Sequence, residues 1–222
     1  MTKRRWLYAA LGVAFLAGYF ALGAFVSFSP PSAFDLGELG AYGQFVAFAA
    51  FLRSAGQFPV YATLCIVALV FGLVRRAWLA AAVILAIELL VVWKISDAFK
   101  ELFHRPRPEA WLVVRESSPS YASGHATLSI ACYGFIAYVV STSGLPKPAK
   151  AAIVAVCALW VLAIGWSRLA LGAHYPSDVL GGYALGAAAL CVALAIYHPT
   201  GLSSPPSRGD RALNAFQKTR RL

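Results

Sequence analysis

The sequence predicts an all-α fold, an integral membrane bundle of about six transmembrane helices. Of its 222 residues, 60% are apolar and only 13% are charged, whereas an ordinary globular chain is about half apolar and about a quarter charged. A bilayer core needs about 20 mostly apolar residues per spanning helix. Six stretches approach that length, namely residues 6–28, 58–74, 77–93, 126–142, 151–166 and 179–198. This composition excludes a water-soluble protein.

The apolar stretches differ in length and in the residues that flank them. The first follows Lys3-Arg4-Arg5, is longer than the apolar region of a signal peptide, and has no small-residue cleavage site after it. It is therefore expected to remain as the first helix. The second to fifth stretches have 16 or 17 residues, so their helices should extend into the flanks. The run 45–52 is too short to span and predicts a helix lying in the membrane interface. Residues 1–198 then form one domain, and the basic tail 199–222 is expected to be disordered.

The basic residues predict the topology. If the chain begins in the cytoplasm, 12 of its 19 Lys and Arg, but only one of its nine acids, fall on the cytoplasmic side. The positive-inside rule then explains the net charge of +10, so no nucleic-acid partner is needed. We therefore expect a plasma-membrane protein with both termini in the cytoplasm. The segments 94–125 and 167–178 would lie on the outer, periplasmic or extracellular, side.

These two outer segments contain three polar motifs. Lys100 and Arg107 belong to a segment that two prolines, Pro106 and Pro108, make rigid. Ser123-Gly124-His125 directly precedes an apolar run, where the free N–H groups of a helix start favour an anion. In the third motif, Ser167-Arg168 is followed by His174 and Asp178, four residues apart, so the carboxylate can reach back to the imidazole. Together the motifs predict a cationic anion site beside two histidines.

With these residues the sequence resembles the phosphatidic acid phosphatase type 2 superfamily, the membrane-bound lipid phosphate phosphatases. That family's signatures are Lys-x6-Arg-Pro, Pro-Ser-Gly-His and Ser-Arg-x5-His-x3-Asp. The chain has all three in order, between Lys100 and Asp178, except that Ala122 replaces the proline of the second signature. The proline contributes rigidity of the loop rather than chemistry.

The resemblance implies an active site at the outer face and a role for each motif residue. His174 would be the nucleophile that forms a phosphohistidine, Asp178 would orient it, and His125 would be the general acid and base. The phosphate group would be bound by Lys100, Arg107, Ser123, Gly124 and Arg168. No cofactor and no metal ion are expected, because side chains supply the positive charge.

The motifs are compatible with more than one substrate and more than one activity. The substrate is expected to be a membrane lipid such as undecaprenyl diphosphate, phosphatidylglycerophosphate or phosphatidic acid. A lipid A phosphatase and a lipid-phosphate phosphotransferase are alternatives, and a vanadate haloperoxidase-like enzyme or a non-enzymatic lipid or anion transporter is more remote. The oligomeric state and the roles of Glu88, His104 and the segment 29–57 are not predicted.

Overall fold

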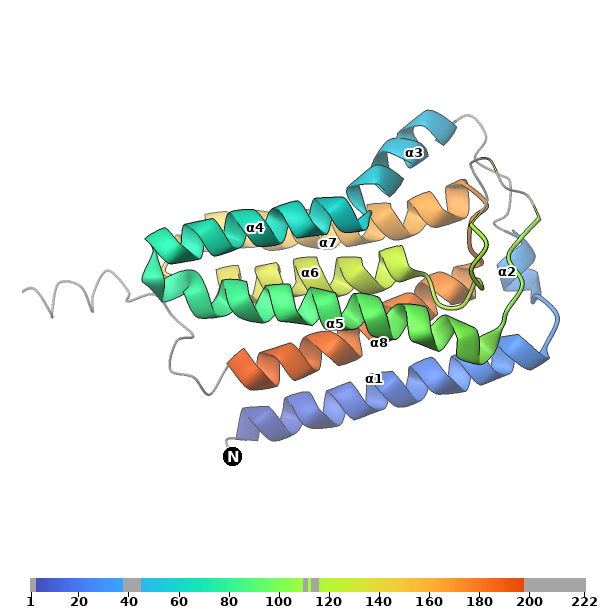
Figure 1. The fold of residues 1–222 in the computed structure, drawn as a ribbon, viewed down its shortest axis with the longest axis horizontal. Coiled ribbons are helices and arrows are strands. Elements are labelled where there is room, and N and C mark those ends of the chain that lie inside the picture. Colours follow the sequence, from blue (N-terminus) through green and yellow to red (C-terminus); the bar gives the residue numbers. More distant parts are fainter. Residues whose placement is uncertain (1–2, 38–44, 110–111, 113–115, 198–222) are drawn as a thin grey trace, which may run out of the picture.

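A computed structural model describes residues 3–37, 45–109, 112 and 116–197, which form a bundle of long helices (Figure 1). The long helices are α1 (Lys3–Phe28), α4 (Phe58–Val74), α5 (Leu79–Phe103), α6 (Gly124–Ser141), α7 (Lys147–Ala170) and α8 (Pro176–Tyr197). The shorter ones are α2 (Ala33–Gly37), α3 (Val46–Ala55) and the 3₁₀ turn η2 (Arg76–Trp78). The predicted all-α class is confirmed.

Five of these helices are long and apolar enough to cross a membrane, and α3 with α4 makes a sixth span if the bent pair crosses as one. The two helices meet at an angle of 43°. Gly56 lies at the bend, where an added Cβ would come within 2.9 Å of the His125 ring and of Ile164. The bend therefore places the start of α4 directly against His125. The prediction of about six transmembrane helices is confirmed.

Two helices are longer than the apolar stretches that predicted them. Helix α5 continues ten residues past position 93, to Phe103, and α7 runs from Lys147 to Ala170 instead of 151–166. A helix does not have to stop where the hydrocarbon stops, because long basic side chains can extend into the headgroup layer. This is the extension into the flanks that their short apolar stretches predicted, and it places Lys100 and Arg168 in the last turns of α5 and α7.

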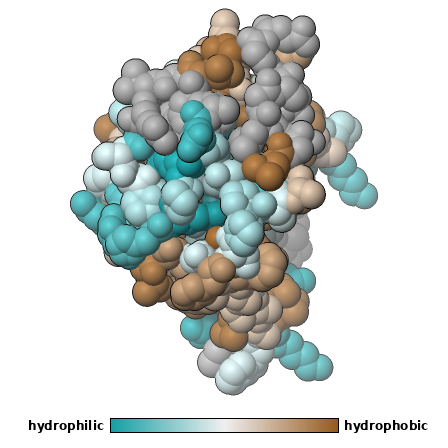
Figure 2. Space-filling view, turned by 90° about the vertical axis from the view of Figure 1, so that its right-hand side faces the viewer, coloured by the Kyte–Doolittle hydropathy of each residue, from teal (hydrophilic) through white to brown (hydrophobic). Residues whose placement is uncertain are grey.

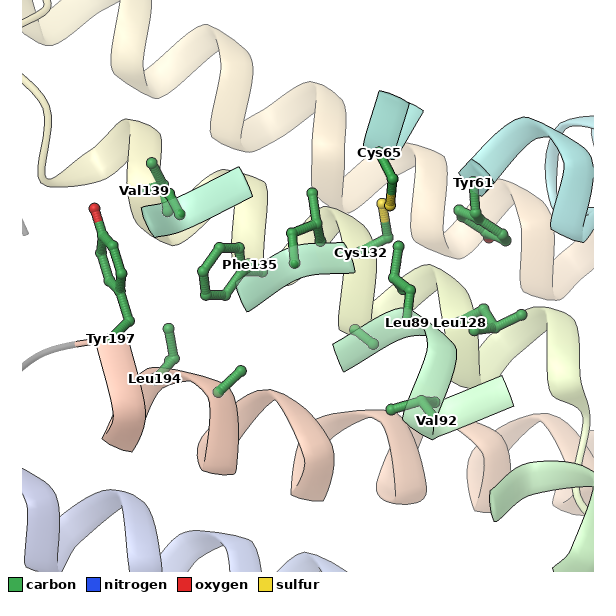
Figure 3. Close-up of a cluster of buried hydrophobic side chains, with 14 residues drawn as sticks. Tyr61, Cys65, Leu89, Val92, Leu128, Cys132, Phe135, Val139, Leu194 and Tyr197 are labelled. Atoms are coloured by element: carbon green, nitrogen blue, oxygen red, sulfur yellow. The ribbon is translucent and has the colours of Figure 1, made fainter. Parts of the chain in front are cut away.

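Helix α8 packs against α1, α5, α6 and α7. Its glycines allow this close approach, because a Cβ at Gly186 would lie 2.4 Å from the carbonyl oxygen of Thr127 on α6. Small residues at such contacts are typical of membrane helices. The largest buried apolar cluster joins α4, α5, α6 and α8, with Cys65 and Cys132 close together in it (Figure 3). All four cysteines are buried and free.

The two ends of the bundle differ in character. The N-terminal end of α1, the turn between α4 and α5 and the connection between α6 and α7 lie at one end of the bundle (Figure 1). Helix α2, the long connection between α5 and α6 and the short connection between α7 and α8 lie at the other end. The first end carries basic residues of three segments: Lys3, Arg4, Arg5, Arg75, Arg76, Lys147 and Lys150. The second end, seen in Figure 2, gathers hydrophilic residues beside the apolar surface of the helices. The predicted tail 199–222 lies outside the described residues.

Candidate active site

The first motif brings three cations to the hydrophilic end of the bundle. Lys100 lies in the last turn of α5, where its Nζ donates to Ser118 Oγ at 3.3 Å. The helix then ends at His104, whose φ of 46° is in the left-handed region that turns the chain away from the helix axis. Arg105 and Arg107 follow, and both side chains are buried.

The guanidinium group of Arg107 is held by backbone carbonyl groups of two segments, the one before α6 and the one before α8. Its Nε donates to the carbonyl oxygen of Ser118 at 2.6 Å, and its Nη1 donates to that of Ala173 at 3.1 Å. The same Nη1 lies 3.2 Å from His174 Nε2. The guanidinium group is thus fixed with one edge against the imidazole.

The second motif forms the start of α6. Ser123 is the residue before the first helical position, and Gly124 and His125 open the helix. The first N–H groups of a helix have no intrahelical acceptor and carry partial positive charge, which favours an anion nearby. The amide of Ser123 donates to the carbonyl oxygen of Asp178 at 3.0 Å, which ties this helix start to that of α8.

The third motif lies where α7 leads into α8. Gly172 has a φ of 63°, a conformation that glycine adopts without strain. The turn lets the amides of Ala173 and His174 donate to the carbonyl oxygen of Arg168, at 3.0 and 3.3 Å. The chain therefore folds back so that His174 lies beside the last turn of α7.

His174 and Asp178 form the expected pair. His174 Nδ1 lies 3.5 Å from Asp178 Oδ2, while Nε2 faces Arg107. Asp178 Oδ2 also accepts from the amide of Tyr175 at 2.9 Å and from Ser120 Oγ at 2.5 Å. The carboxylate therefore caps the first turn of α8 and contacts the imidazole with the same oxygen. This geometry favours the tautomer with a proton on Nδ1 and a lone pair on Nε2.

The surroundings of His174 keep its ring neutral. The side chain is 1% exposed, and burial lowers the pKa of His174 well below its usual value of 6.5. The nearby charges of Arg168, Arg107 and Lys100 lower this pKa further. A neutral imidazole keeps the lone pair that a nucleophile needs.

Several buried donors around the two histidines make no hydrogen bond within the described part of the chain. They are Nε and Nη1 of Arg168, Oγ of Ser123 and Nε2 of His125. Unsatisfied polar groups cost free energy when buried, so a cluster of them indicates a site for a polar ligand. Their chemistry, mostly donors around a cationic centre, fits an anion with several acceptor oxygens such as a phosphate group.

Glu116 is the acidic residue that contacts the arginines Arg107 and Arg168 of this cluster. Its carboxylate accepts from Arg107 Nη2 at 2.8 Å and from Arg168 Nη2 at 3.2 Å, and it lies 3.9 Å from Arg53 of α3. Burial acts to raise the pKa of Glu116, but Arg168 and Arg107 outweigh it, so this pKa lies below its usual value. Glu116 is therefore ionised and occupies donors that a phosphate group would also use.

A cavity of about 440 Å³ leads to the cluster. Its polar part contains Lys100, His125 and His174, and its apolar part contains Phe58, Trp93 and Leu128. The apolar residues come from α4, α5 and α6, and the outward surfaces of α4 and α5 expose large apolar side chains such as Ile66, Val70 and Ile87. The cavity thus joins the hydrophobic side of the bundle to its charged end.

All eight residues that the sequence singled out lie at this one end, in or beside the cluster. The sequence reasoning missed four others, namely Asp35, Arg105, Glu116 and Ser120. Arg105 is buried against Asp178. The sequence feature that could have identified Arg105 is the dipeptide Arg105-Pro106, which directly precedes Arg107-Pro108. No signal identified Asp35, which comes from α2, about 140 residues before its partner Ser177.

The fold and the site define a multi-pass membrane protein with a buried cluster of histidine, arginine and lysine at one end of its helices. The chain belongs to the PAP2 superfamily, because residues 76–201, more than half of the chain, match that family. This confirms the resemblance seen in the three motifs. The matched residues include the second motif, in which Ala122 replaces the proline.

Proteins of known activity are similar to part of the chain. Phosphatidylglycerophosphatase B of Bacillus subtilis is 38% identical over 94 residues, 41% of this chain and 46% of the relative. Decaprenylphosphoryl-5-phosphoribose phosphatase of Mycobacterium tuberculosis is 37% identical over 117 residues, 51% of this chain and 57% of the relative. The chain thus spans about half the length of these relatives.

A solved structure has a similar fold over most of the chain. The crystal structure of a transmembrane PAP2-type phosphatidylglycerolphosphate phosphatase from Bacillus subtilis superposes with a TM-score of 0.75, covering 85% of this chain and 96% of the other. The sequences are 21% identical, so this likeness concerns the fold.

Proposed function

We propose that this protein is a lipid phosphate phosphatase that uses His174 as its nucleophile. The observation that carries the proposal is the position of His174 Nε2, which faces Arg107 at 3.2 Å while Nδ1 faces Asp178 at 3.5 Å. A neutral imidazole, oriented by a carboxylate and aimed at a cationic cluster, is the arrangement needed to attack phosphorus. Membership in the PAP2 superfamily supports the same reaction.

In the first step Nε2 of His174 attacks the phosphorus atom, and the bond from phosphorus to the oxygen of the lipid breaks. His125, which takes up a proton when the negatively charged phosphate group binds beside it, gives that proton to the oxygen as it leaves. Lys100, Arg107 and Arg168 stabilise the negative charge on the three equatorial oxygens, and Ser123 Oγ with the Gly124 amide donates hydrogen bonds. The charge that develops on the His174 ring is balanced by Asp178 through Nδ1–H.

In the second step water attacks the phosphohistidine. His125, now neutral, accepts a proton from the water, and the bond between Nε2 and phosphorus breaks to release inorganic phosphate. The lone pair returns to Nε2 and the enzyme is ready for another substrate. Side-chain cations supply the charge at every stage, so the reaction is proposed to need no metal ion.

The cavity supports a lipid as the substrate. Its apolar part, at Phe58, Trp93 and Leu128, could hold the first carbons of an acyl or prenyl chain while the phosphate group reaches His174. The relatives act on a phosphatidylglycerophosphate and on a decaprenyl-linked phosphate by their names. We therefore propose a lipid phosphate or diphosphate of the glycerophospholipid or polyprenyl class. From the distribution of basic residues, the site would open on the outer side of the plasma membrane.

The test is release of inorganic phosphate by the purified full-length protein in detergent with EDTA. Phosphatidylglycerophosphate, phosphatidic acid, undecaprenyl diphosphate and lipid A 1-phosphate are compared as substrates. We expect release by the wild type and by Glu101→Gln, an exposed position whose only ion pair is with the exposed His104 in the described structure. We expect none from His174→Ala. Equal release by His174→Ala would overturn the proposed nucleophile, and no release from any lipid would overturn the proposed activity.

A further inference from the structure

Arg105 is shared by two buried carboxylates. Its Nη1 donates to Asp178 Oδ1 at 2.5 Å, and its Nη2 donates to Asp35 Oδ2 at 3.0 Å. The guanidinium group also stacks over the Tyr175 ring, with Cζ at 4.4 Å from the ring centre. Arg105 and the two acids are each at most 3% exposed. Such a fully desolvated cluster is costly to bury unless its geometry is closely matched.

The second carboxylate oxygen of Asp35, Oδ1, is hydrogen-bonded to the first turn of α8. Oδ1 accepts from the amide of Ser177 at 3.1 Å and from its hydroxyl at 2.7 Å. Ser177 directly precedes Asp178, and its Oγ also accepts from Arg105 at 2.7 Å. Asp35 comes from α2, in the segment 29–57, and lies outside the residues that match the PAP2 superfamily. The segment thus reaches the helix turn that carries Asp178.

The contacts leave Asp178 with a single orientation. Oδ1 is occupied by Arg105, so Oδ2 is the oxygen that faces His174, Ser120 and the Tyr175 amide. Without Arg105, nothing would hold Oδ1 in place, so the carboxylate plane could rotate away from the imidazole, and the carboxylate would lose its nearest cation. A displacement of about 1 Å in a catalytic group can cost about 100-fold in rate.

The charges of the cluster also match the proposed reaction. Two carboxylates and one guanidinium carry a net charge of −1, beside a neutral His174. In the transition state the imidazole gains a positive charge, which the cluster then balances. Without Asp35, the Asp178–Arg105 pair would carry no net charge, and the stabilisation of the imidazolium would be weaker.

We propose that Asp35 and Arg105 are positioning residues for the reaction of His174, acting through Asp178, and that this is the role of the segment that carries α2. The inference rests on the proposed phosphatase activity. Neither residue lines the cavity that contains Lys100, His125 and His174. Arg105 does border a second cavity, of about 540 Å³, beside Arg107 and Glu116, but its side chain is only 3% exposed. Their removal should therefore slow phosphoryl transfer without weakening the binding of substrate.

The experiment compares Asp35→Asn, Arg105→Lys and Arg105→Met with the wild type, and Glu101→Gln is the matched control. Each full-length protein is purified in detergent, its active sites are counted by titration with orthovanadate, and kcat per active site is measured with KM. We expect Asp35→Asn to lower kcat by about 10- to 100-fold while KM changes by less than about threefold. Arg105→Lys should lose less than Arg105→Met, because it keeps the charge.

The count of active sites separates this role from a structural one. A residue that only stabilises the fold would lower the number of sites and leave kcat per site unchanged, and that result for Asp35→Asn would overturn the inference. If Asp35→Asn yields no folded protein, the two Arg105 variants decide: kcat per site equal to that of the wild type in both would overturn it. Failure of the wild type on every lipid would instead overturn the proposed activity.

Discussion

The carboxylate of Glu116 bridges two arginines of the cluster, and its contact with Arg168 joins residues 52 positions apart in the chain. Glu116 Oε1 accepts from Arg168 Nη2 at 3.2 Å, and Oε2 accepts from Arg107 Nη2 at 2.8 Å. The proposed substrate would bring two or more negative charges to the same guanidinium groups. The Glu116 carboxylate must then either leave these guanidinium groups or share them with the substrate. Glu116 should therefore compete with the phosphate group for Arg107 and Arg168.

Glu116→Gln is expected to lower KM, and the inhibition constant of orthovanadate, by about three- to tenfold. The change removes a charge that competes for Arg107 and Arg168, and ion pairs of partly exposed groups have modest net strength. Steady-state kinetics in detergent would measure both constants. A higher KM in this variant would contradict competition and would mean that Glu116 holds the arginines in place for the substrate.

Asp178→Asn is expected to lower kcat by about 10³- to 10⁴-fold, because an amide cannot balance the charge on His174 and can select the wrong tautomer. It should also lower the unfolding temperature, since Arg105 loses one of its two buried carboxylates. Turnover is therefore measured on the monodisperse fraction after size-exclusion chromatography. Near-normal kcat in that fraction would remove Asp178 from the proposed mechanism.

His125→Gln should discriminate between leaving groups. A general acid matters for an alkoxide, which is a poor leaving group, and matters little for p-nitrophenolate, which leaves without a proton. We expect the first turnover of a lipid phosphate to slow by about 10²- to 10⁴-fold, while p-nitrophenyl phosphate still phosphorylates His174 in a burst. Equal losses with both substrates would assign His125 to binding rather than to proton transfer.

The neutral state of His174 predicts a dependence of stability on pH. The folded protein has a lowered pKa at His174, so below about pH 6.5 only the unfolded chain binds a proton there. Keeping His174 neutral therefore costs the folded protein no stability above about pH 6.5, where the unfolded chain is also neutral at this residue. As the pH falls from there toward the pKa of the folded state, the free energy of unfolding decreases by up to about 1.4 kcal/mol per pH unit.

His174→Gln lacks this group and serves as the comparison. Between about pH 7.5 and about pH 5.5, the unfolding temperature of the wild type should fall more than that of His174→Gln, as followed by intrinsic fluorescence in detergent. Parallel curves would mean that His174 takes up a proton in the folded state.

The proposed topology can be tested with single cysteines, because the four native cysteines are buried. Ser117 and Gly144 are exposed and lie at opposite ends of the bundle. A membrane-impermeant maleimide added to intact cells should label Ser117→Cys and leave Gly144→Cys unlabelled until the membrane is opened. The reverse pattern would place the site on the cytoplasmic side.

The helical stretches could be predicted from the sequence because a bilayer requires long apolar runs. The run 58–74 predicted α4 to the residue. The ends of α5 and α7 could not be predicted in this way, because hydropathy indicates where the hydrocarbon ends rather than where the backbone stops being helical. The expected extension into the flanks is observed, and it places Lys100 and Arg168 in the last turns of α5 and α7.

The sequence by itself determined the membrane architecture, the family and the residues of the three motifs, since apolar runs and motif spacing are local properties of the chain. Only the tertiary structure decided which groups satisfy one another. Arg105 between Asp35 and Asp178, and Glu116 between Arg107 and Arg168, join segments far apart in the chain. Pairings of this kind depend on how the helices pack and on the need to neutralise buried charge, and no local pattern encodes them.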